Sequence, residues 1–201
     1  MTENVEPPMP LPKILVFAGS LRTGSYNGRL AALAAKELTL ADADVMRVSL
    51  ADYPLPIYDA DHEAKSGAPL NAIKLKQVMG AHQGVFIASP EYNASITPLL
   101  KNTLDWISRV RERGDPPLAA YKHRVFALGA ASPGRYGGMR SLMALRQVLE
   151  IGCGALVIPE QVSVIQADHA FDDMDNLKEA RIADQLRNVA RVLVEMARQV
   201  V

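Results

Sequence analysis

Short apolar segments alternate with segments of helical periodicity along most of this chain, and that alternation constrains the fold more than any other feature. Four of the apolar segments are continuous, as expected for strands that are buried on both faces of a sheet. They are KILVFA at 13–18, GVFIAS at 84–89, RVFALG at 124–129 and ALVIP at 155–159. The segment DVMRVS at 44–49 instead alternates apolar and polar residues, which is typical of a less buried edge strand.

Apolar residues recur at helical spacing in the segments between and after these strands. Helices are predicted over 26–40, from Leu70 onward, from Pro98 onward, over 139–151 and over 176–200. Strands and helices that alternate in this way form parallel sheets with crossover helices. The sequence therefore predicts an α/β fold: a flavodoxin-like doubly wound sheet of five parallel strands in the order 2-1-3-4-5, with helices on both faces.

The length of 201 residues suits a single domain. Residues 1–12 contain four prolines and are predicted to form a disordered N-terminal tail, so the domain is expected to occupy residues 13–201. Residues 50–69 contain three prolines and are predicted to form a long loop.

Charge, cysteine and histidine content exclude several classes of function. Lys and Arg total 22 and Asp and Glu total 22, so the chain lacks the basic excess of most nucleic-acid-binding proteins. The single cysteine, Cys153, cannot form an intramolecular disulfide or a cysteine-based metal site, and is interpreted as a buried packing thiol. The four histidines have no spacing typical of a zinc site, so no metal site is predicted.

The sequence also predicts the cellular compartment of the protein. Its N-terminus is acidic and proline-rich, without the basic start and apolar stretch of a secretory signal. No apolar run approaches the roughly 20 residues of a membrane-spanning helix. A single cysteine fits a reducing compartment. A cytoplasmic protein with no membrane span is therefore expected.

Ligands of doubly wound sheets bind beyond the carboxyl ends of the strands, so three loops are candidate binding segments. The first, GSLRTGSYN at 19–27, joins a buried strand to a helix. A helix N-terminus presents free N–H groups and partial positive charge, which attract phosphate, and Gly19 and Gly24 allow the backbone to bend close to an anion. The side chains that can donate to a phosphate or neutralise it are Ser20, Arg22, Ser25 and Asn27.

The spacing of Gly19 and Gly24 imitates a nucleotide P-loop, but Ser25 stands where that motif needs lysine. Leu21 occupies the second glycine position of the dinucleotide motif G-x-G-x-x-G. A terminal monophosphate therefore suits this loop better than a nucleoside triphosphate or a dinucleotide. The alternative is a plain Gly/Ser turn that only caps the helix.

The second loop, SPEYNAS at 89–95, follows the predicted central strand. Glu91, Tyr92 and Asn93 can line a flat heteroaromatic ring through backbone amides and aromatic stacking. A turn that leads into a helix capped by Thr97 explains the remaining residues of the loop, but it does not explain these three as well.

The third loop, ASPGRYGG at 131–138, contains three glycines that allow a ligand to approach the backbone closely. An ordinary glycine-rich turn between a strand and a helix explains the same residues equally well.

Two motifs together, GSLRTGSYN and SPEYNASITPLLKNTLDW, resemble the NADPH-dependent FMN reductase family, which includes quinone, chromate and azo-dye reductases of flavodoxin-like fold. The resemblance extends through most of residues 13–160. It implies an FMN cofactor whose phosphate is held by Ser20, Arg22, Ser25 and Asn27, with Tyr26 beside them. It also implies that the isoalloxazine ring is flanked by Pro90, Glu91, Tyr92 and Asn93, and bordered from the third loop by Ser132, Gly134 and Gly137.

The resemblance implies an FMN-dependent NAD(P)H oxidoreductase that passes hydride from NADPH to bound FMN and then electrons to a quinone, chromate, azo or similar small-molecule acceptor. It also implies a homodimer or homotetramer. Because the flavin carries the chemistry, no catalytic side chain is nominated. Two alternatives stay open: a flavodoxin-like FMN-binding electron carrier without NADPH activity of its own, and a nucleotide-binding or regulatory module without flavin. The balanced charge disfavours the carrier, since carriers often need an acidic face.

We predict that Arg22→Ala weakens the binding of FMN far more than the binding of NADPH to the FMN-loaded enzyme, because the guanidinium neutralises the flavin phosphate. Titration of the apo variant with FMN measures this effect. An unchanged affinity would place the phosphate elsewhere.

Overall fold

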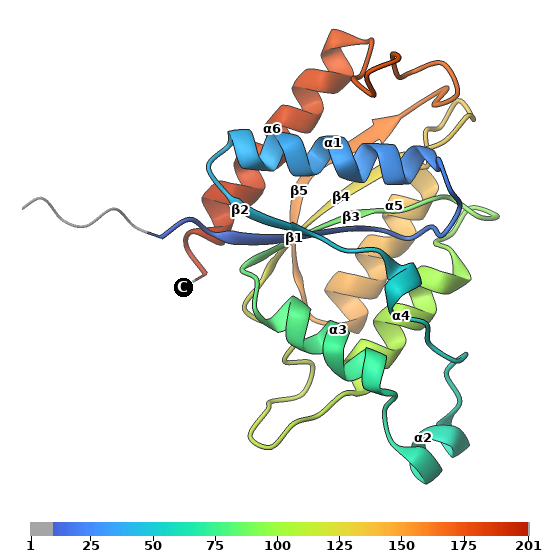
Figure 1. Ribbon diagram of the computed structural model, residues 1–201, viewed down its shortest axis with the longest axis vertical. Helices are drawn as coiled ribbons and strands as arrows, with labels where there is room; N and C mark the ends of the chain where they lie inside the picture. Colours follow the sequence, from blue (N-terminus) through green and yellow to red (C-terminus); the bar gives the residue numbers. More distant parts are fainter. Residues whose placement is uncertain (1–9, 201) are drawn as a thin grey trace, which may run out of the picture.

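Five parallel strands run side by side through the centre of the molecule, with helices on either side of them (Figure 1). In this computed structural model, which describes residues 10–200, the strands stand in the order β2-β1-β3-β4-β5. Their bounds are β1 (Lys13–Ala18), β2 (Asp44–Arg47), β3 (Gly84–Ala88), β4 (Val125–Ala131) and β5 (Leu156–Val164). The predicted fold class and strand order are confirmed.

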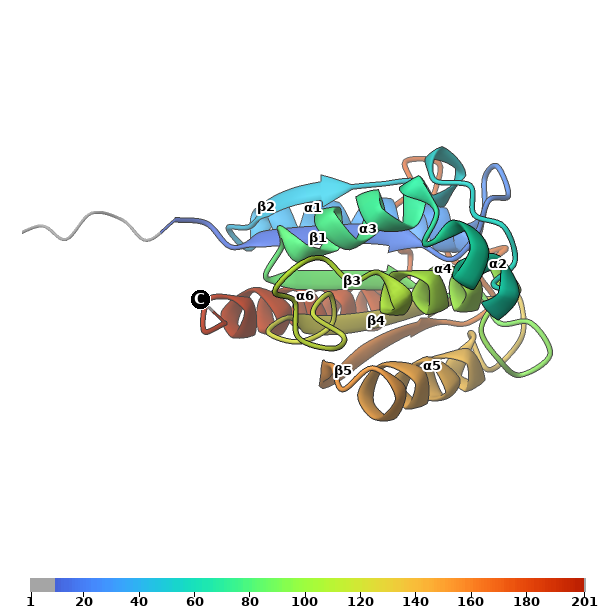
Figure 2. The same ribbon diagram turned by 90° about the horizontal axis from the view of Figure 1, so that it is seen from below.

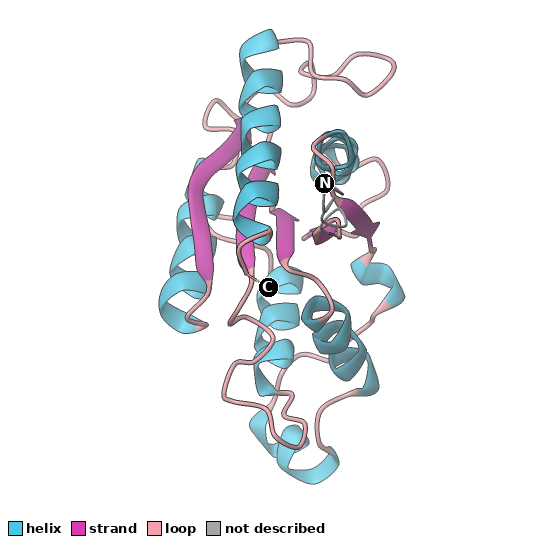
Figure 3. Cartoon of the chain, turned by 90° about the vertical axis from the view of Figure 1, so that its left-hand side faces the viewer, coloured by secondary structure: helices cyan, strands magenta, loops and turns pink. Residues whose placement is uncertain are grey.

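Helices cover both faces of the sheet, which confirms the doubly wound arrangement. The helices that form the two layers are α1 (Tyr26–Leu40), α3 (Leu70–Gly80), α4 (Pro98–Arg109), α5 (Met139–Arg146) and α6 (Ala180–Ala197). One face packs against α1 and α6, and the other packs against α3, α4 and α5, the face that Figure 2 presents. Figure 3 shows the strands between these two layers.

Alternation along β1 explains why its sequence is continuously apolar. Ile14 and Val16 belong to the core beneath α1 and α6, whereas Leu15 and Phe17 belong to the core beneath α3, α4 and α5. At the edge of the sheet, β2 leaves Met46 exposed, which confirms the edge position that its alternation predicts.

The predicted long loop 50–69 contains two short helices that the sequence analysis missed, a 3₁₀ turn (Leu50–Asp52) and α2 (Ala60–Ser66). The α2 helix begins at Asp59, whose carboxylate accepts a hydrogen bond of 2.7 Å from the backbone N–H of His62. None of the residues of α2 is buried, so the helix has no apolar stripe by which periodicity could reveal it.

Strand β5 continues to Val164, well past the predicted end at residue 159. A β-bulge at the proline allows this, because proline has no backbone N–H to donate to the neighbouring strand. The register with β4 shifts between Phe126 and Leu128, which leaves Pro159 within the bulge, where no ladder hydrogen bond is needed. The guanidinium of Arg146 donates to the Pro159 carbonyl (3.1 Å) and thereby holds the bulge in place. The last helices also end differently from prediction, since a π-helical segment (Gln147–Gly152) follows α5 and α6 is shorter at both ends.

Most of the predicted N-terminal tail, residues 1–9, lies outside the described residues, and its disorder stays a prediction. Pro12 is placed, and its carbonyl accepts a hydrogen bond of 3.0 Å from the backbone N–H of Asp44.

A buried lysine anchors the loop that joins α4 to β4. The Lys76 side chain on α3 is 8% exposed, and its ammonium donates to the carboxylates of Glu112 and Asp115. The hydrogen bonds from Lys76 lower the pKa of both carboxyl groups. A carboxyl group whose pKa is depressed by folding stabilises the fold above its unfolded pKa, and that contribution is lost as the pH falls through the folded pKa.

We therefore predict that Lys76→Met lowers the free energy of unfolding at pH 7. Its difference from the wild type is expected to shrink as the pH falls below about 4, where the carboxyl groups of the unfolded chain become protonated, and on through the lower pKa values of Glu112 and Asp115 in the folded protein. Urea unfolding at pH 7, 5 and 3.5 measures the difference. Lys74→Met, on the exposed face of the same helix, is the matched control. A difference that stays constant with pH would contradict the assignment.

Candidate functional site

The turn after β1 leads directly into the N-terminus of α1 and leaves polar backbone groups free. Ser25 caps the helix, with its hydroxyl accepting a hydrogen bond of 2.9 Å from the backbone N–H of Gly28. Gly24 has a φ of +65°, which turns the chain sharply before the cap. Among residues 10–200, the N–H groups of Tyr26 and Asn27 donate to no protein acceptor. The turn therefore presents free donors of the kind that bind anions.

Arg22 adds a positive charge beside these donors. Its guanidinium lies 5.3 Å from the centre of the Tyr26 ring, and it forms no ion pair with any residue in the described part of the chain. The backbone N–H of Arg22 donates to the Ser20 hydroxyl at 3.3 Å. The predicted phosphate residues of this loop therefore lie together, with one cation available to a ligand.

The side chain of Asn27 joins the first loop to the third. It is buried, its amide N–H donates to the Ala131 carbonyl (2.8 Å), and its amide oxygen accepts from the Ala131 N–H (2.9 Å). Both hydrogen-bonding atoms of the side chain are thus used to join the first loop to the third. The prediction that Asn27 contacts a phosphate then depends on its backbone N–H.

The second loop is a tight turn at the end of β3. Tyr92 and Ser95 exchange two backbone hydrogen bonds of 2.9 and 3.0 Å, while Asn93 and Ala94 between them have φ values of 49° and 62°. Positive φ at both central residues defines a type I′ turn. The turn leaves the Tyr92 side chain 57% exposed. Below it, the Thr97 hydroxyl donates to the Gly19 carbonyl at 2.8 Å and so ties the second loop to the first.

Arg140 is a site residue that sequence reasoning missed. Its guanidinium and its backbone N–H both donate to the Glu91 carboxylate, at 2.6 and 3.1 Å, and the Glu91 side chain is only 7% exposed. This pair ties the second loop to the start of α5. One sequence signal was present: a cation in the first turn of a helix is unfavourable unless an acid pairs with it.

In the third loop, packing explains Gly137 and Gly138 better than close approach of a ligand does. A Cβ atom on Gly137 would lie 2.6 Å from the Ser163 hydroxyl, and Gly137 has a φ of +56°. A Cβ atom on Gly138 would lie 2.6 Å from that of Ala130. Ser132 instead faces the first loop across a shared pocket.

The three loops enclose one pocket of about 180 Å³ at the carboxyl ends of the strands. The predicted site residues that line it are Ser20, Arg22, Ser25, Tyr26, Asn27, Pro90, Glu91, Tyr92 and Ser132. Three other predicted residues, Asn93, Gly134 and Gly137, do not line it.

Comparisons with known proteins show the family of this chain. A family model described as NADPH-dependent FMN reductase matches residues 12–169. The chain belongs to this family. Among curated relatives, a quinone reductase of Escherichia coli is 37% identical over 138 residues, which are 68% of this chain and 69% of that one. An NAD(P)H-dependent FMN reductase of Pseudomonas aeruginosa is 32% identical over 90% of this chain and 92% of its own.

Solved structures support the fold. A flavoenzyme NAD(P)H:(acceptor) oxidoreductase, FerB from Paracoccus denitrificans, superposes with a TM-score of 0.77 at 24% identity, covering 94% of this chain and 98% of its own. The family membership makes this protein an oxidoreductase that uses FMN and NAD(P)H, as the two loop motifs predict. It argues against a flavin-free nucleotide-binding module.

The other candidate chemistries find little support. Burial raises the pKa of the Cys153 thiol to about 11, which suits a packing residue and not a nucleophile. Among residues 10–200, no cluster of three or more His, Cys, Asp and Glu side chains is placed to hold a metal ion. No helix in the same part of the chain is long and apolar enough to cross a membrane.

We predict that Asn27→Ala lowers the free energy of unfolding by about 2–4 kcal/mol, because it leaves the buried N–H and carbonyl of Ala131 without partners. Urea denaturation monitored by circular dichroism measures the loss. Asn188→Ala, on the exposed face of α6, serves as the control and is expected to change stability by less than about 0.5 kcal/mol. Equal losses in the two variants would show that the bonds to Ala131 contribute little.

Proposed function

We propose that this reductase binds FMN at the pocket between the three loops, with the flavin phosphate on the 19–27 loop and the rest of the group extending beyond the pocket, and transfers electrons from NADPH to a quinone or to a chromate, azo or similar acceptor. One observation carries the proposal. Residues from loops more than a hundred positions apart, chosen from sequence as FMN contacts, line a single pocket at the N-terminus of α1.

The residues fit the group they are proposed to hold. A phosphate on the first loop would accept hydrogen bonds from the free N–H groups of Tyr26 and Asn27, and Arg22 would neutralise it. Ser20 and Ser25 add hydroxyls at the same end of the pocket.

The ring end of the pocket is formed by the second and third loops. Pro90 and Tyr92 would border the isoalloxazine ring on one side, with Ser132 on the other. Glu91, held by Arg140, would fix the backbone against which the ring lies. Asn93, Gly134 and Gly137 lie outside the pocket, so they would act through the shape of their turns.

When bound, FMN supplies the redox chemistry, accepting hydride and then delivering electrons to a second substrate. This chain's contribution is to bind, orient and shield the group. Hydride transfer needs no side-chain acid or base, so no catalytic residue is proposed among the residues that line the pocket. The exposed ring of Tyr92 lies at the rim, where an acceptor would enter.

A quinone acceptor is supported by the names of relatives, which include a quinone reductase of Escherichia coli and an NADPH:quinone oxidoreductase of Arabidopsis thaliana. Chromate and azo compounds are further candidates, because a permissive pocket over a flavin can reduce many acceptors.

We also propose that the protein forms a homodimer or homotetramer in the cytoplasm. The surface of α5, the π-helical segment after it and β5 supports an oligomer, since Met143, Ile151 and Leu156 are exposed there. Glu160 at the same edge has a buried carboxylate oxygen without a partner among the described residues, which a second copy could supply. The single buried thiol of Cys153 fits a reducing compartment.

The function is tested by FMN titration of the apo protein, followed by steady-state oxidation of NADPH and NADH with a panel of quinone, chromate and azo acceptors. We expect a yellow complex and sustained consumption of NADPH with at least one quinone. A protein that binds FMN but oxidises no NADPH would be an electron carrier. A protein that stays colourless with added FMN would contradict the proposed site.

A further inference from the structure

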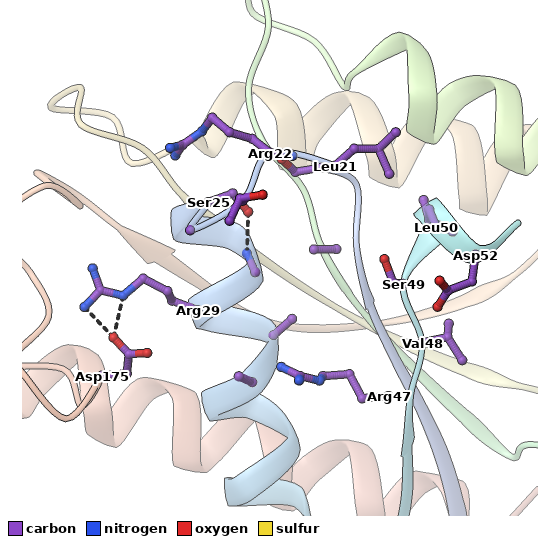
Figure 4. A pocket seen from close by; sticks show the side chains of 17 residues that line it. Leu21, Arg22, Ser25, Arg29, Arg47, Val48, Ser49, Leu50, Asp52 and Asp175 are labelled. Carbon is purple, nitrogen blue, oxygen red and sulfur yellow. Dashed lines mark hydrogen bonds and ion pairs between the residues drawn. The ribbon is translucent and has the colours of Figure 1, made fainter. Parts of the chain in front are cut away.

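A second and larger cavity lies on the other side of the phosphate loop, between α1 and the end of β2 (Figure 4). We call it the α1–β2 groove; its volume is about 530 Å³, within the range of small-molecule sites. Ser20, Arg22 and Ser25 line both the groove and the flavin pocket, so the two cavities adjoin across this loop. Apart from these three shared residues, no residue of the proposed FMN site lines the groove.

The walls of the groove suit a flat, partly apolar group. On the α1 side it is lined by Gly28, Ala31 and Ala32, whose small side chains leave room along the helix. Leu21, 55% exposed, adds apolar surface from the phosphate loop. A planar base can lie against such a surface, with polar partners at its edges.

Of the three arginines that line the groove, Arg22 and Arg47 form no ion pair within residues 10–200, and Arg47 is the one outside the phosphate loop. Arg29 is already paired, since its guanidinium donates to Asp175 at 2.7 Å, and Figure 4 shows this pair on the side of α1 away from β2. Arg47, the last residue of β2, extends toward α1 in the same view. Within residues 10–200, Arg47 forms no ion pair and its side chain makes no hydrogen bond. Its guanidinium has the shape and charge to bind a phosphomonoester in two-point contact.

We propose that the α1–β2 groove binds the adenosine end of NADPH and that Arg47 contacts the 2′-phosphate, which makes Arg47 the residue that selects NADPH over NADH. Arg47 lines the groove from the end of β2 and, unlike Arg22, does not also line the flavin pocket. A dinucleotide with its adenosine in the groove extends over the shared loop toward the flavin pocket. This inference rests on the proposed function.

Binding of fragments without a nicotinamide ring tests the groove apart from catalysis. Calorimetric titrations of the FMN-loaded protein with adenosine 2′,5′-bisphosphate and with adenosine 5′-monophosphate measure the effect of the 2′-phosphate. We expect the bisphosphate to bind about tenfold or more tightly than the monophosphate in the wild type, and this advantage to disappear in Arg47→Ala. Arg113→Ala, another exposed arginine that lies outside the groove, is the matched control and should keep the advantage.

Steady-state kinetics give the second measurement. The ratio of kcat/KM for NADPH to kcat/KM for NADH is expected to fall about tenfold or more in Arg47→Ala, to recover in part in Arg47→Lys, and to stay at the wild-type value in Arg113→Ala. A ratio and a bisphosphate affinity that do not change in Arg47→Ala would overturn the inference.

The outcomes separate this inference from the proposed function. If the wild type binds FMN and oxidises NADPH, but Arg47→Ala keeps the wild-type selectivity, only the role of the groove is wrong. If the wild type binds no FMN, the proposed function is contradicted, and the inference that rests on it is overturned with it. If Arg47→Ala instead weakens FAD binding and leaves the coenzyme ratio unchanged, the groove holds the adenosine of a flavin dinucleotide, and our assignment is overturned.

Discussion

The site depends on a closed set of hydrogen bonds that ties three loops to one another. Asn27 joins the first loop to the third through both amide atoms, Thr97 joins the second to the first, and Glu91 joins the second to the start of α5. Loops at the edge of a parallel sheet have no ladder to hold them, so each would otherwise move alone. Because two pairs of loops are joined directly and the second loop is also held by the start of α5, the pocket is formed before a ligand enters, and less ordering is needed on binding.

Helix α1 serves both cavities, with different parts of its surface. Its first turn provides free N–H groups and the Ser25 cap to the proposed flavin pocket. Small residues further along, Gly28, Ala31 and Ala32, open the α1–β2 groove on the side toward the sheet edge. The phosphate loop therefore has a cavity on either side of it. Hydrogen bonds from Thr97 and Asn27 hold the two ends of the loop in place. One loop can thus stand between a flavin phosphate and a second nucleotide.

The sequence predicts elements that a local burial pattern specifies, and it misses features that depend on contacts between residues far apart in the chain. The strands at 13–18 and 84–88 were predictable because both of their faces are buried, and such burial leaves a continuous apolar run. The α2 helix was not, because nothing in it is buried. The end of β5 was missed because its bulge depends on Arg146, a residue on another element.

By itself, the sequence determined the parallel sheet, its edge strand and the three loops that meet at its carboxyl end, because local periodicity and turn residues record burial and chain direction. The tertiary structure alone decided that the Asn27 amide faces Ala131, that Glu91 pairs with Arg140, and that Gly137 packs against β5. Each of these contacts joins residues at least 26 positions apart, as for Ser163 and Gly137. No local pattern specifies the partner of a buried polar atom, since that partner is chosen only when the sheet brings distant segments together.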